Sequence, residues 1–393
     1  MMSRAPAERL FTAPFVALGI ADLCYFTAFG VTIFTLPLYV TGPVGGNDAA
    51  AGLAFGVFAL SALVLRPIVG RLTDLHGRRP FLVGGALIAA VSLGSLALTE
   101  NIVVIIALRL LAGVAEAAFF VAGFAALVDI APPTRLGEAL SYNSLGLYLG
   151  IALGPPLGEV LVRALGFGLA WVSAAGLSLL TAGLCSIVGE TRAGPPPTGD
   201  APPLIHRPAL PIVLGFLASL LAMSGFLAFA SLQGVRVGLA NASLALLVYG
   251  GVVVVCRIVF ARVPDRLPSL ILGSAALGTI AAGLVLAAAW PSPVGLILGA
   301  AVAAVGVAFS TPAFFSAIFA TAEPTQRGAA SGTASAAIDI GLGLGPIMLG
   351  VVADGFGIPW AFGVGAAIAM AGAFWTLALH RRSSVRRPPV ASS

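Results

Sequence analysis

Twelve apolar runs, each close to or above the length of a membrane-spanning helix, constrain this chain more than any other feature. A helix needs ~20 residues to cross the ~30 Å hydrocarbon layer. A membrane β-barrel would instead show alternating segments of ~10 residues, whereas glycine and proline are tolerated inside membrane helices. Only 9% of the residues are charged, against about a quarter in soluble domains. We therefore predict an all-α membrane protein with 12 transmembrane helices. The runs lie at about 13–41, 49–69, 81–99, 102–128, 139–162, 168–188, 209–233, 241–261, 269–290, 294–320, 329–352 and 359–379.

The first half of the chain is repeated in the second half at an offset of 191 residues. Internal repeats in an apolar chain are typical of transporters, whose substrate site lies between the repeats near mid-membrane. We predict two pseudo-symmetric six-helix bundles, 1–189 and 209–380, joined by a Pro-rich cytoplasmic linker, 190–208, and followed by an Arg-rich cytoplasmic tail, 381–393. The matched pairs include Arg66 with Arg257, Arg71 with Arg262, Asp74 with Asp265, Gly150 with Gly341, Gly154 with Gly345 and Pro155 with Pro346.

The distribution of arginine predicts the orientation, because cytoplasmic loops retain basic residues. With the N-terminus inside, 15 of the 20 arginines fall in cytoplasmic segments, and only Arg163 and Arg236 fall outside. We expect a multi-pass protein of the inner (plasma) membrane with both termini cytoplasmic. The net charge of +5 then reflects topology and requires no nucleic-acid partner.

Several classes of chemistry are disfavoured by residues that the sequence lacks. The chain contains no lysine, which excludes a P-loop and hence energisation by ATP. Its three cysteines have no metal-like spacing, and no histidines, cysteines or serines cluster with a base. We expect no enzyme activity, no metal and no cofactor.

The loop after the second run reads Gly70-Arg-Leu-Thr-Asp74-Leu-His-Gly77-Arg78-Arg79-Pro80. It resembles the loop signature of the major facilitator superfamily, Gly-x-Leu-x-Asp-Arg-x-Gly-Arg-Lys/Arg, with Leu75 in place of the first Arg. The resemblance implies that Asp74 docks on the N-terminus of the eleventh helix in the outward-open state. It also implies that Arg78 bridges to an acid at the cytoplasmic end of the fourth helix, where Asp129 lies. The predicted switch loop comprises Gly70, Asp74, Gly77, Arg78, Arg79 and Asp129.

Ionisable residues deep within the runs are candidates for proton coupling. The fourth run contains Arg109-Leu-Leu-Ala-Gly113-Val-Ala-Glu116, similar to the Arg-x-x-Gln-Gly pattern of the same superfamily with Ala112 at the Gln position. Arg109, Asp22 and Glu116 are expected roughly 10, 17 and 20 Å below the outer edge. Charges at such depth are costly and usually face a cavity or one another. We predict that Asp22, Glu116, Arg109 and Asp339 handle protons; structural ion pairing is the alternative.

The fifth run carries glycines every four residues, Gly146, Gly150, Gly154 and Gly158, with Pro155 after the third. Such a stripe favours close helix packing, and the proline bends the helix. It resembles the motif that the superfamily shows mainly in antiporters, although Gly158-Glu159 replaces the usual closing Gly-Gly. The antiporter-like motif comprises Gly150, Gly154, Pro155 and Gly158. We expect Gly150, Gly154 and Pro155 to pack against a helix of the other half and to block leak.

In this superfamily helices 1, 4, 7 and 10 line the central cavity. Here these runs carry many aromatic rings and few fixed polar groups, which suits amphipathic or aromatic compounds and poorly fits sugars or phosphates. Each ring taken singly is better explained by core packing or lipid contact, and only together do the rings indicate an apolar cavity. The predicted cavity residues are Tyr25, Phe26, Phe29, Phe119, Phe120, Phe226, Phe229, Phe314 and Phe315.

The resemblance covers essentially the whole chain and implies a secondary active transporter of the drug/proton antiporter (efflux) branch. We expect proton-coupled export of small amphipathic compounds, such as drugs or metabolites, by alternating access. The expected partners are this substrate, protons and the lipid bilayer, and we expect a monomer. Uptake of a small metabolite by symport is an alternative within transport. A non-transporting membrane receptor or scaffold is an alternative of another class.

Overall fold

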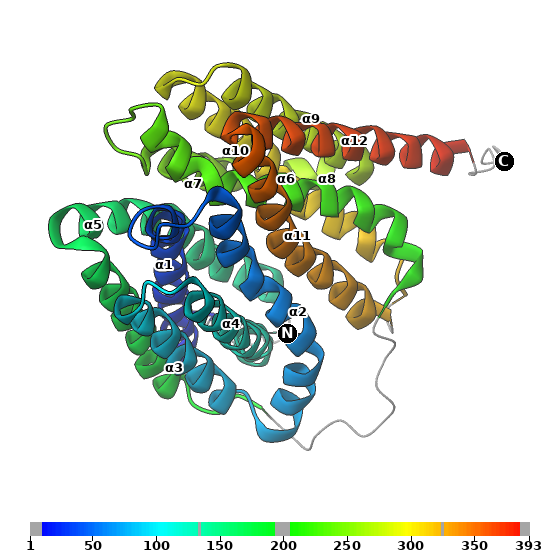
Figure 1. Cartoon of the computed structure of the whole chain (residues 1–393). Helices are drawn as coiled ribbons and strands as arrows, with labels where there is room; N and C mark the ends of the chain where they lie inside the picture. Colours follow the sequence, from blue (N-terminus) through cyan, green and yellow to red (C-terminus); the bar gives the residue numbers. More distant parts are fainter. Residues whose placement is uncertain (1–9, 133–134, 193–204, 324–325, 386–393) are drawn as a thin grey trace, which may run out of the picture. The chain divides into compact units, whose positions relative to one another are not determined.

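The computed structural model describes residues 10–132, 135–192, 205–323 and 326–385, and nearly all of them are helical (Figure 1). Side-chain caps fix some helix starts: the Asn101 side chain accepts from the N–H of Val103 (2.9 Å), and Ser292 accepts from Gly295 (3.1 Å). The described residues contain no β-strand. The helices are α1 (Ala13–Thr41), α2 (Asp48–His76), α3 (Arg79–Ser95), α4 (Ile102–Ile130), α5 (Leu136–Val188), α6 (Leu210–Arg236), α7 (Leu244–Val259), α8 (Val263–Arg266), α9 (Ser269–Ala289), α10 (Pro293–Phe319), α11 (Arg327–Phe356) and α12 (Ile358–Val385), with short 3₁₀ turns at Leu96–Leu98 and Arg207–Ala209.

The lengths of these helices fit a membrane. Within the described ranges, ten helical segments are long and apolar enough to cross one, and α7 is a shorter apolar helix. The prediction of an all-helical protein with many membrane-spanning segments is therefore confirmed. The count of twelve spans and the side on which the termini lie stay predictions.

Helix α5 is broken at Gly166, which has φ 80° and ψ 173°. This backbone conformation is readily adopted by glycine and strained for other residues. The break separates the arms 136–165 and 167–188, and it falls where the sequence predicts a boundary between the fifth and sixth runs. The connection between α11 and α12 turns in a similar way at Gly357, with φ 92°.

Contacts divide the chain into two compact units. Unit 1 comprises Met1–Thr35 and Ser61–Gly199, and unit 2 comprises Leu36–Leu60 and Asp200–Ser393. The segment 36–60 contains the end of α1 and the first part of α2, so both helices are shared between the units. In unit 1, α3 packs against α4 and α5.

Unit 2 contains α6 to α12 together with the end of α1 and the first part of α2. Helix α9 packs against α10 and α12, and α6 packs against α11 and α12. The first part of α2 contacts α11 through glycines, since a Cβ atom at Gly52 would overlap the carbonyl oxygen of Pro346. At the start of α2, Asp48 forms a two-pronged ion pair with Arg236 of α6, at 2.7 and 2.8 Å.

Candidate functional site: a buried charge cluster and a loop network

The interior of unit 1 holds a cluster of polar side chains from α1, α4 and α5. Asp22 of α1 is 5% exposed and Arg109 of α4 is 2% exposed. Glu116 lies two turns further along α4 and is partly buried. Three of the four residues predicted to handle protons therefore lie on packed helices of one unit.

Hydrogen bonds and charge interactions connect this cluster. The Tyr25 hydroxyl donates to Glu116, and Asp22 is hydrogen-bonded by Asn143 of α5. Arg109 lies close enough to Tyr25 and Glu116 to interact with both electrostatically. The carboxyl groups of Asp22 and Glu116 also interact electrostatically with each other. The cluster therefore combines two carboxylates with one buried cation and neutral hydrogen-bond donors.

Aromatic rings and a second arginine border the cluster. The ring of Tyr25 stacks on Phe119, with centroids 4.0 Å apart and an interplanar angle of 11°. The Arg66 guanidinium of α2 lies 4.6 Å from the centroid of the Phe120 ring, a cation–π arrangement, and also acts electrostatically on Tyr25. With both acids ionised, Asp22, Glu116 and Arg109 together carry one negative charge, which a single proton neutralises.

Asp339, the fourth predicted proton-handling residue, lies on α11 in unit 2 and is 1% exposed. The structure therefore assigns it to a different unit from Asp22, Glu116 and Arg109. Its role stays a prediction.

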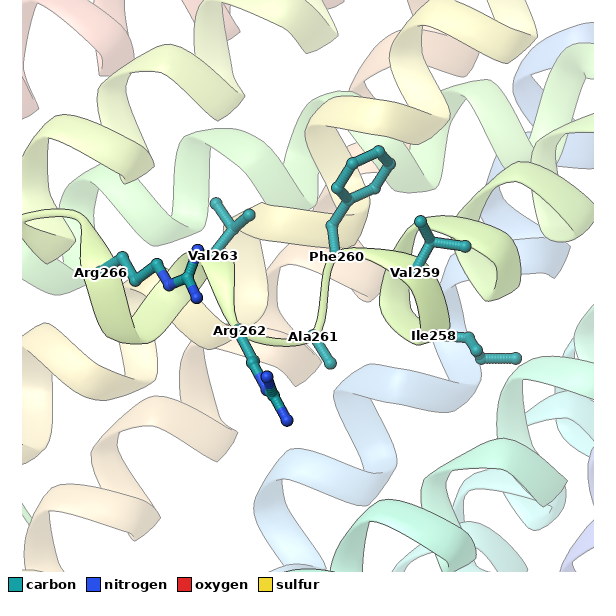
Figure 2. Close-up of a pocket in the computed structure, with 7 residues that line it drawn as sticks. All are labelled: Ile258, Val259, Phe260, Ala261, Arg262, Val263 and Arg266. Atoms are coloured by element: carbon teal, nitrogen blue, oxygen red, sulfur yellow. The ribbon is translucent and has the colours of Figure 1, made fainter.

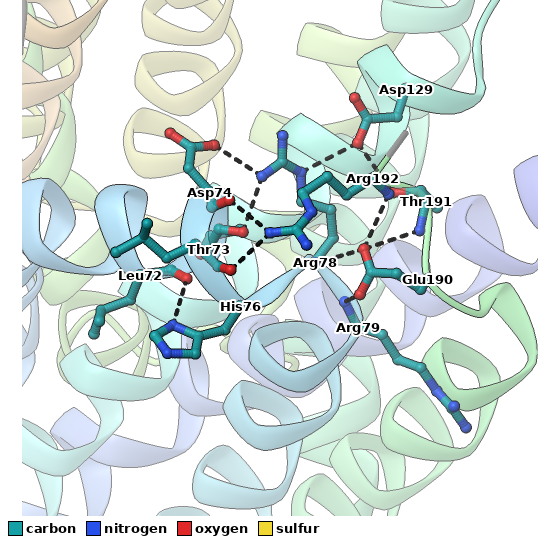
Figure 3. A network of polar contacts seen from close by, with 11 residues as sticks. Leu72, Thr73, Asp74, His76, Arg78, Arg79, Asp129, Glu190, Thr191 and Arg192 are labelled. Carbon is teal, nitrogen blue, oxygen red and sulfur yellow. Dashed lines mark hydrogen bonds and ion pairs between the residues drawn. The ribbon is translucent and has the colours of Figure 1, made fainter. Parts of the chain in front are cut away.

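The loop between α2 and α3 forms a second polar centre, shown in Figure 3. Arg78 donates to Asp74 (Nη1 to Oδ1, 2.8 Å), to the carbonyl oxygen of Thr73 (2.9 Å) and to Asp129 of α4 (Nε to Oδ2, 3.1 Å). The pairing of Arg78 with Asp129 implied by the family resemblance is thus present. Docking of Asp74 on the eleventh helix would join residues of different units, and it stays a prediction.

The residues that follow α5 also belong to this network. Partial burial opposes ionisation of Glu190, but hydrogen bonds from the backbone N–H groups of Arg78, Arg192, Arg79 and Thr191 outweigh it and hold the pKa of this carboxyl below its usual value. Arg192 donates to the carbonyl oxygens of Asp74 (2.8 Å) and Leu75 (2.7 Å). Gly77, with φ 96°, lies against Glu190, where a Cβ atom would overlap the carboxylate.

The glycine stripe of α5 packs against α1 of the same unit. A Cβ atom at Gly150 would lie 2.7 Å from the carbonyl carbon of Phe26, and one at Gly154 would overlap the backbone of Gly30. A Cβ atom at Gly158 would lie 3.2 Å from the carbonyl oxygen of Val31. The expectation that Gly150 and Gly154 face a helix of the other half is therefore wrong. Close packing is correct, but the neighbour is the first helix of the same sequence repeat.

The second repeat shows the corresponding arrangement. On α11, a Cβ atom at Gly341 would overlap the side chain of Leu220, and one at Gly345 would overlap Ser224, both on α6. Helix α6 follows the linker as the first long helix of the second half, as α1 is of the first. The repeat seen in the sequence thus extends to which helices pack together.

The predicted cavity residues are mostly enclosed within their own units. Tyr25, Phe26, Phe119, Phe226, Phe229 and Phe314 are buried, and Phe29, Phe120 and Phe315 are partly exposed. Tyr25 and Phe119 border the charge cluster, whereas Phe226, Phe229, Phe314 and Phe315 belong to unit 2. Contact of these rings with a substrate stays a prediction.

A pocket of about 420 Å³ lies where α7 ends and α8 begins. It is lined by apolar side chains of 258–263 and by Arg262 and Arg266 (Figure 2). It occupies the second-repeat position of the switch loop, because Arg262 matches Arg71 in the sequence repeat. Its residues lie outside the charge cluster of unit 1.

Comparison with known proteins gives the family. The family model of the Major Facilitator Superfamily matches residues 18–318 and 271–392. The chain belongs to the Major Facilitator Superfamily. It is a membrane transporter of this type, from a superfamily of carriers that are typically non-enzymatic.

Relatives of this transporter match along almost the whole chain. An uncharacterized MFS-type transporter of Pseudomonas aeruginosa (strain UCBPP-PA14) is 30% identical over 403 aligned positions, covering 95% of each protein. One from Burkholderia pseudomallei (strain 1106a) is 26% identical and covers 92% of this chain and 90% of that protein. Both are described as uncharacterized MFS-type transporters.

Solved structures of low sequence identity share the fold. A bacterial homologue of the human lysosomal transporter Spinster, in an inward-facing and occupied conformation, has a TM-score of 0.77 at 16% identity and covers 96% of this chain and 98% of its own. The human organic anion transporter MFSD10 has a TM-score of 0.68 at 18% identity, covering 95% of this chain and 100% of its own. At such identities the likeness shows the fold alone.

Some residues of the two polar centres were not singled out from the sequence. Asn143 is an amide within an apolar run, and this is a signal from which a polar contact inside the protein can be predicted. Glu190 and Arg192 fall at the start of the Pro-rich linker, where composition predicts only a spacer. Their partners lie more than a hundred residues earlier in the chain.

Proposed function

We propose that this transporter couples proton movement to the export of small amphipathic compounds, as an antiporter of the drug/proton efflux branch. The observation that carries the proposal is the buried cluster of Asp22, Glu116 and Arg109. Placing ionisable groups within membrane helices is costly, and such groups in transporters mark ion pathways and proton relays. The aromatic rings of Tyr25 and Phe119 beside the cluster supply apolar contact area that suits amphipathic substrates.

In the proposed cycle, a proton from outside binds one carboxylate of the cluster. Neutralising the net negative charge of Asp22, Glu116 and Arg109 lowers the cost of enclosing these groups away from water. The protonated protein favours the inward-facing state, in which a substrate displaces the proton toward the cytoplasm. The substrate-loaded protein then returns to the outward-facing state. A ligand shifts such an equilibrium only by its difference in affinity for the two states.

The proposal includes the topology expected from the sequence. The two arms of α5 each span the membrane, and with the shorter α7 they bring the number of spans to twelve. Both termini lie in the cytoplasm, and the protein resides in the inner membrane as a monomer. The proton gradient supplies the driving force, without a cofactor.

The test is a transport assay in inverted membrane vesicles, with a panel of fluorescent amphipathic dyes under an imposed pH gradient. Asp22→Asn and Glu116→Gln remove one acid each and nearly preserve side-chain shape. We expect gradient-driven dye transport to fall at least about tenfold in each, the equivalent of ~1.4 kcal/mol. Glu100→Gln, which removes an exposed acid in the α3–α4 connection, is the matched control and should transport normally.

A second measurement separates proton coupling from structural ion pairing. Dye exchange between two equal pools, without a pH gradient, requires binding and conformational change but no net proton movement. Variants defective only in coupling should keep this exchange, whereas structurally damaged proteins should lose both activities. Full gradient-driven transport by both neutral variants would refute the proposal. Gradient-driven accumulation in the same direction as proton flow would instead support symport.

A further inference from the structure

We infer that Glu190, Thr191 and Arg192, the tripeptide that opens the linker, form part of the switch loop and hold the α2–α3 connection in place. This inference rests on the proposed transport function for its effect on turnover. The contacts themselves do not depend on it. All of them lie within unit 1.

Glu190 caps the start of α3. The first N–H groups of a helix have no partner within the helix, and the N-cap residue Arg78 provides no side-chain cap. Glu190 accepts from the N–H of Arg78 (2.9 Å) and of Arg79 (3.3 Å). A carboxylate is also favoured near a helix N-terminus by the helix dipole.

Arg192 caps the end of α2, only two residues further along the chain. Its Nη1 donates to the carbonyl oxygens of Asp74 and Leu75 in the last turn of α2. A cation at a helix C-terminus is favoured by the dipole, as the carboxylate is at the N-terminus. One short segment therefore satisfies two consecutive helix ends with charges of the appropriate sign.

Thr191 extends the contact to α4. Its hydroxyl donates to Oδ2 of Asp129 at 3.1 Å, the same oxygen that accepts from Nε of Arg78. The tripeptide thus contacts the end of α2, the start of α3 and the end of α4, as Figure 3 shows. If the α2–α3 connection moves relative to α4, the hydrogen bonds of Arg78 and Thr191 to Asp129 must break or rearrange.

The position of Leu75 gives Arg192 a specific role. The superfamily signature has an arginine where this chain has Leu75, so the loop lacks one of its usual cations. Arg192 brings a guanidinium to the carbonyl oxygen of that same residue. We infer that Arg192, from the linker, replaces the missing cation and acts as a positioning residue for the switch.

Hydrogen–deuterium exchange on the purified full chain tests the contacts without requiring transport. Peptides covering 75–82 should exchange about tenfold faster or more in Glu190→Ala than in wild type, because a charge-assisted hydrogen bond is lost. Glu190→Gln should give a smaller change. Peptides within 84–95 should be unaffected if α3 remains folded. Unchanged exchange at 75–82 in Glu190→Ala would overturn the inference.

Dye transport in vesicles tests the role of Arg192. Arg192→Gln should slow maximal transport several-fold with little change in the half-saturating dye concentration. Arg135→Gln, which removes the arginine of the Arg135–Glu138 ion pair, should not. Adding Leu75→Arg to Arg192→Gln should restore at least half of the lost rate, since Leu75 is 45% exposed and leaves room for a longer side chain. Failure of this rescue would overturn the replacement role. Absence of transport by wild type would count against the proposed function, and the exchange experiment would still decide the contacts.

Discussion

The close approach of α1 and α5 at Gly154 predicts a large effect of one methyl group. Gly154 and Gly30 face each other, so that a Cβ atom on Gly154 would overlap the backbone of Gly30 and lie 2.6 Å from the carbonyl oxygen of Thr27. The neighbouring atoms are backbone and cannot rotate away. In Gly154→Ala, therefore, α1 and α5 must move apart.

The size of the effect follows from two opposing contributions. Carbon atoms pack best at ~3.5–4.0 Å, so the helices must separate by about 1 Å at this point. Overpacking of this kind costs about 1–3 kcal/mol. Replacing a helical glycine by alanine gains about 0.5–1 kcal/mol through backbone entropy. The difference between these contributions is about 0–2.5 kcal/mol, and we expect Gly154→Ala to lower the free energy of unfolding by a value near the middle of this range, about 1 kcal/mol.

Gly176→Ala is the matched control in the second arm of the same helix. Nothing lies within 4 Å of a Cβ atom at Gly176, and its φ is not positive. Gly176→Ala should therefore leave the free energy of unfolding unchanged or raise it by up to about 1 kcal/mol. We measure the free energy of unfolding in detergent micelles for wild type and both variants under identical conditions. The change in each variant relative to wild type is then compared. Gly154→Ala should thus lower the free energy of unfolding, whereas Gly176→Ala should leave it unchanged or raise it.

Transport by the two variants adds a functional comparison. Gly146, two turns before Gly154, lies against Asp22, with 3.5 Å between its Cβ position and that of Asp22. Separating α1 from α5 should therefore weaken the Asp22–Asn143 hydrogen bond and reduce gradient-driven dye transport. Gly176→Ala should transport normally. Equal stability of Gly154→Ala and Gly176→Ala would contradict the close packing of α1 against α5 at Gly154.

Three further predictions concern charged residues. Asp74→Asn should slow turnover with little change in substrate affinity, because Asp74 is bonded to Arg78 at the loop and not to the buried cluster; a pure affinity defect in transport assays would contradict this. Asp48→Asn should lower the free energy of unfolding in detergent by about 1–2 kcal/mol, a value between those of exposed and buried ion pairs, because Asp48 is buried while the Arg236 side chain is 45% exposed. Equal stability of variant and wild type would show that the ion pair contributes nothing. Because the pKa of Glu190 is held below its usual value, the contribution of Glu190 to loop stability should be complete above about pH 4.3 and decline as the pH falls through the lowered pKa. This prediction is contradicted if amide protection at 75–82, corrected for intrinsic exchange, stays constant through this acid range.

The helical class and the repeat could be predicted because they depend on patterns that the chain carries locally. Run length alone indicates membrane helices, and a repeat needs only comparison of the sequence with itself. The break at Gly166 also lies where the apolar runs separate. Pairing of Arg78 with Asp129 follows from the family resemblance, which implies that this arginine bridges to an acid at the end of the fourth helix, where the sequence places Asp129. Each of these signals is complete within the sequence.

The packing partners could not be predicted, for identifiable physical reasons. A glycine stripe indicates that some helix approaches closely, but it carries no information on which one. The prediction that Gly154 packs against the other half is therefore wrong. Bonding of Tyr25 to Glu116 depends on the rotation and register of α1 relative to α4. From the sequence alone, a tyrosine in an apolar run such as Tyr25 therefore indicates only a cavity or core residue. The role of Arg192 was hidden because linker composition dominates its surroundings.

Helix α4 connects the buried cluster with the loop network. Glu116 and Asp129 lie on this one uninterrupted helix, about 20 Å apart along its axis at 1.5 Å per residue. A helix of this length transmits a shift of one end to the other, because its backbone hydrogen bonds resist local bending. Under the proposed function, a change of charge at Glu116 alters the position in which α4 is most stable, and Asp129 moves with it relative to Arg78 and Thr191. The contacts of Asp129 with these two residues then set how readily α4 responds. The linker tripeptide, which supplies Thr191, would thereby influence the proton-driven step from the opposite end of the helix.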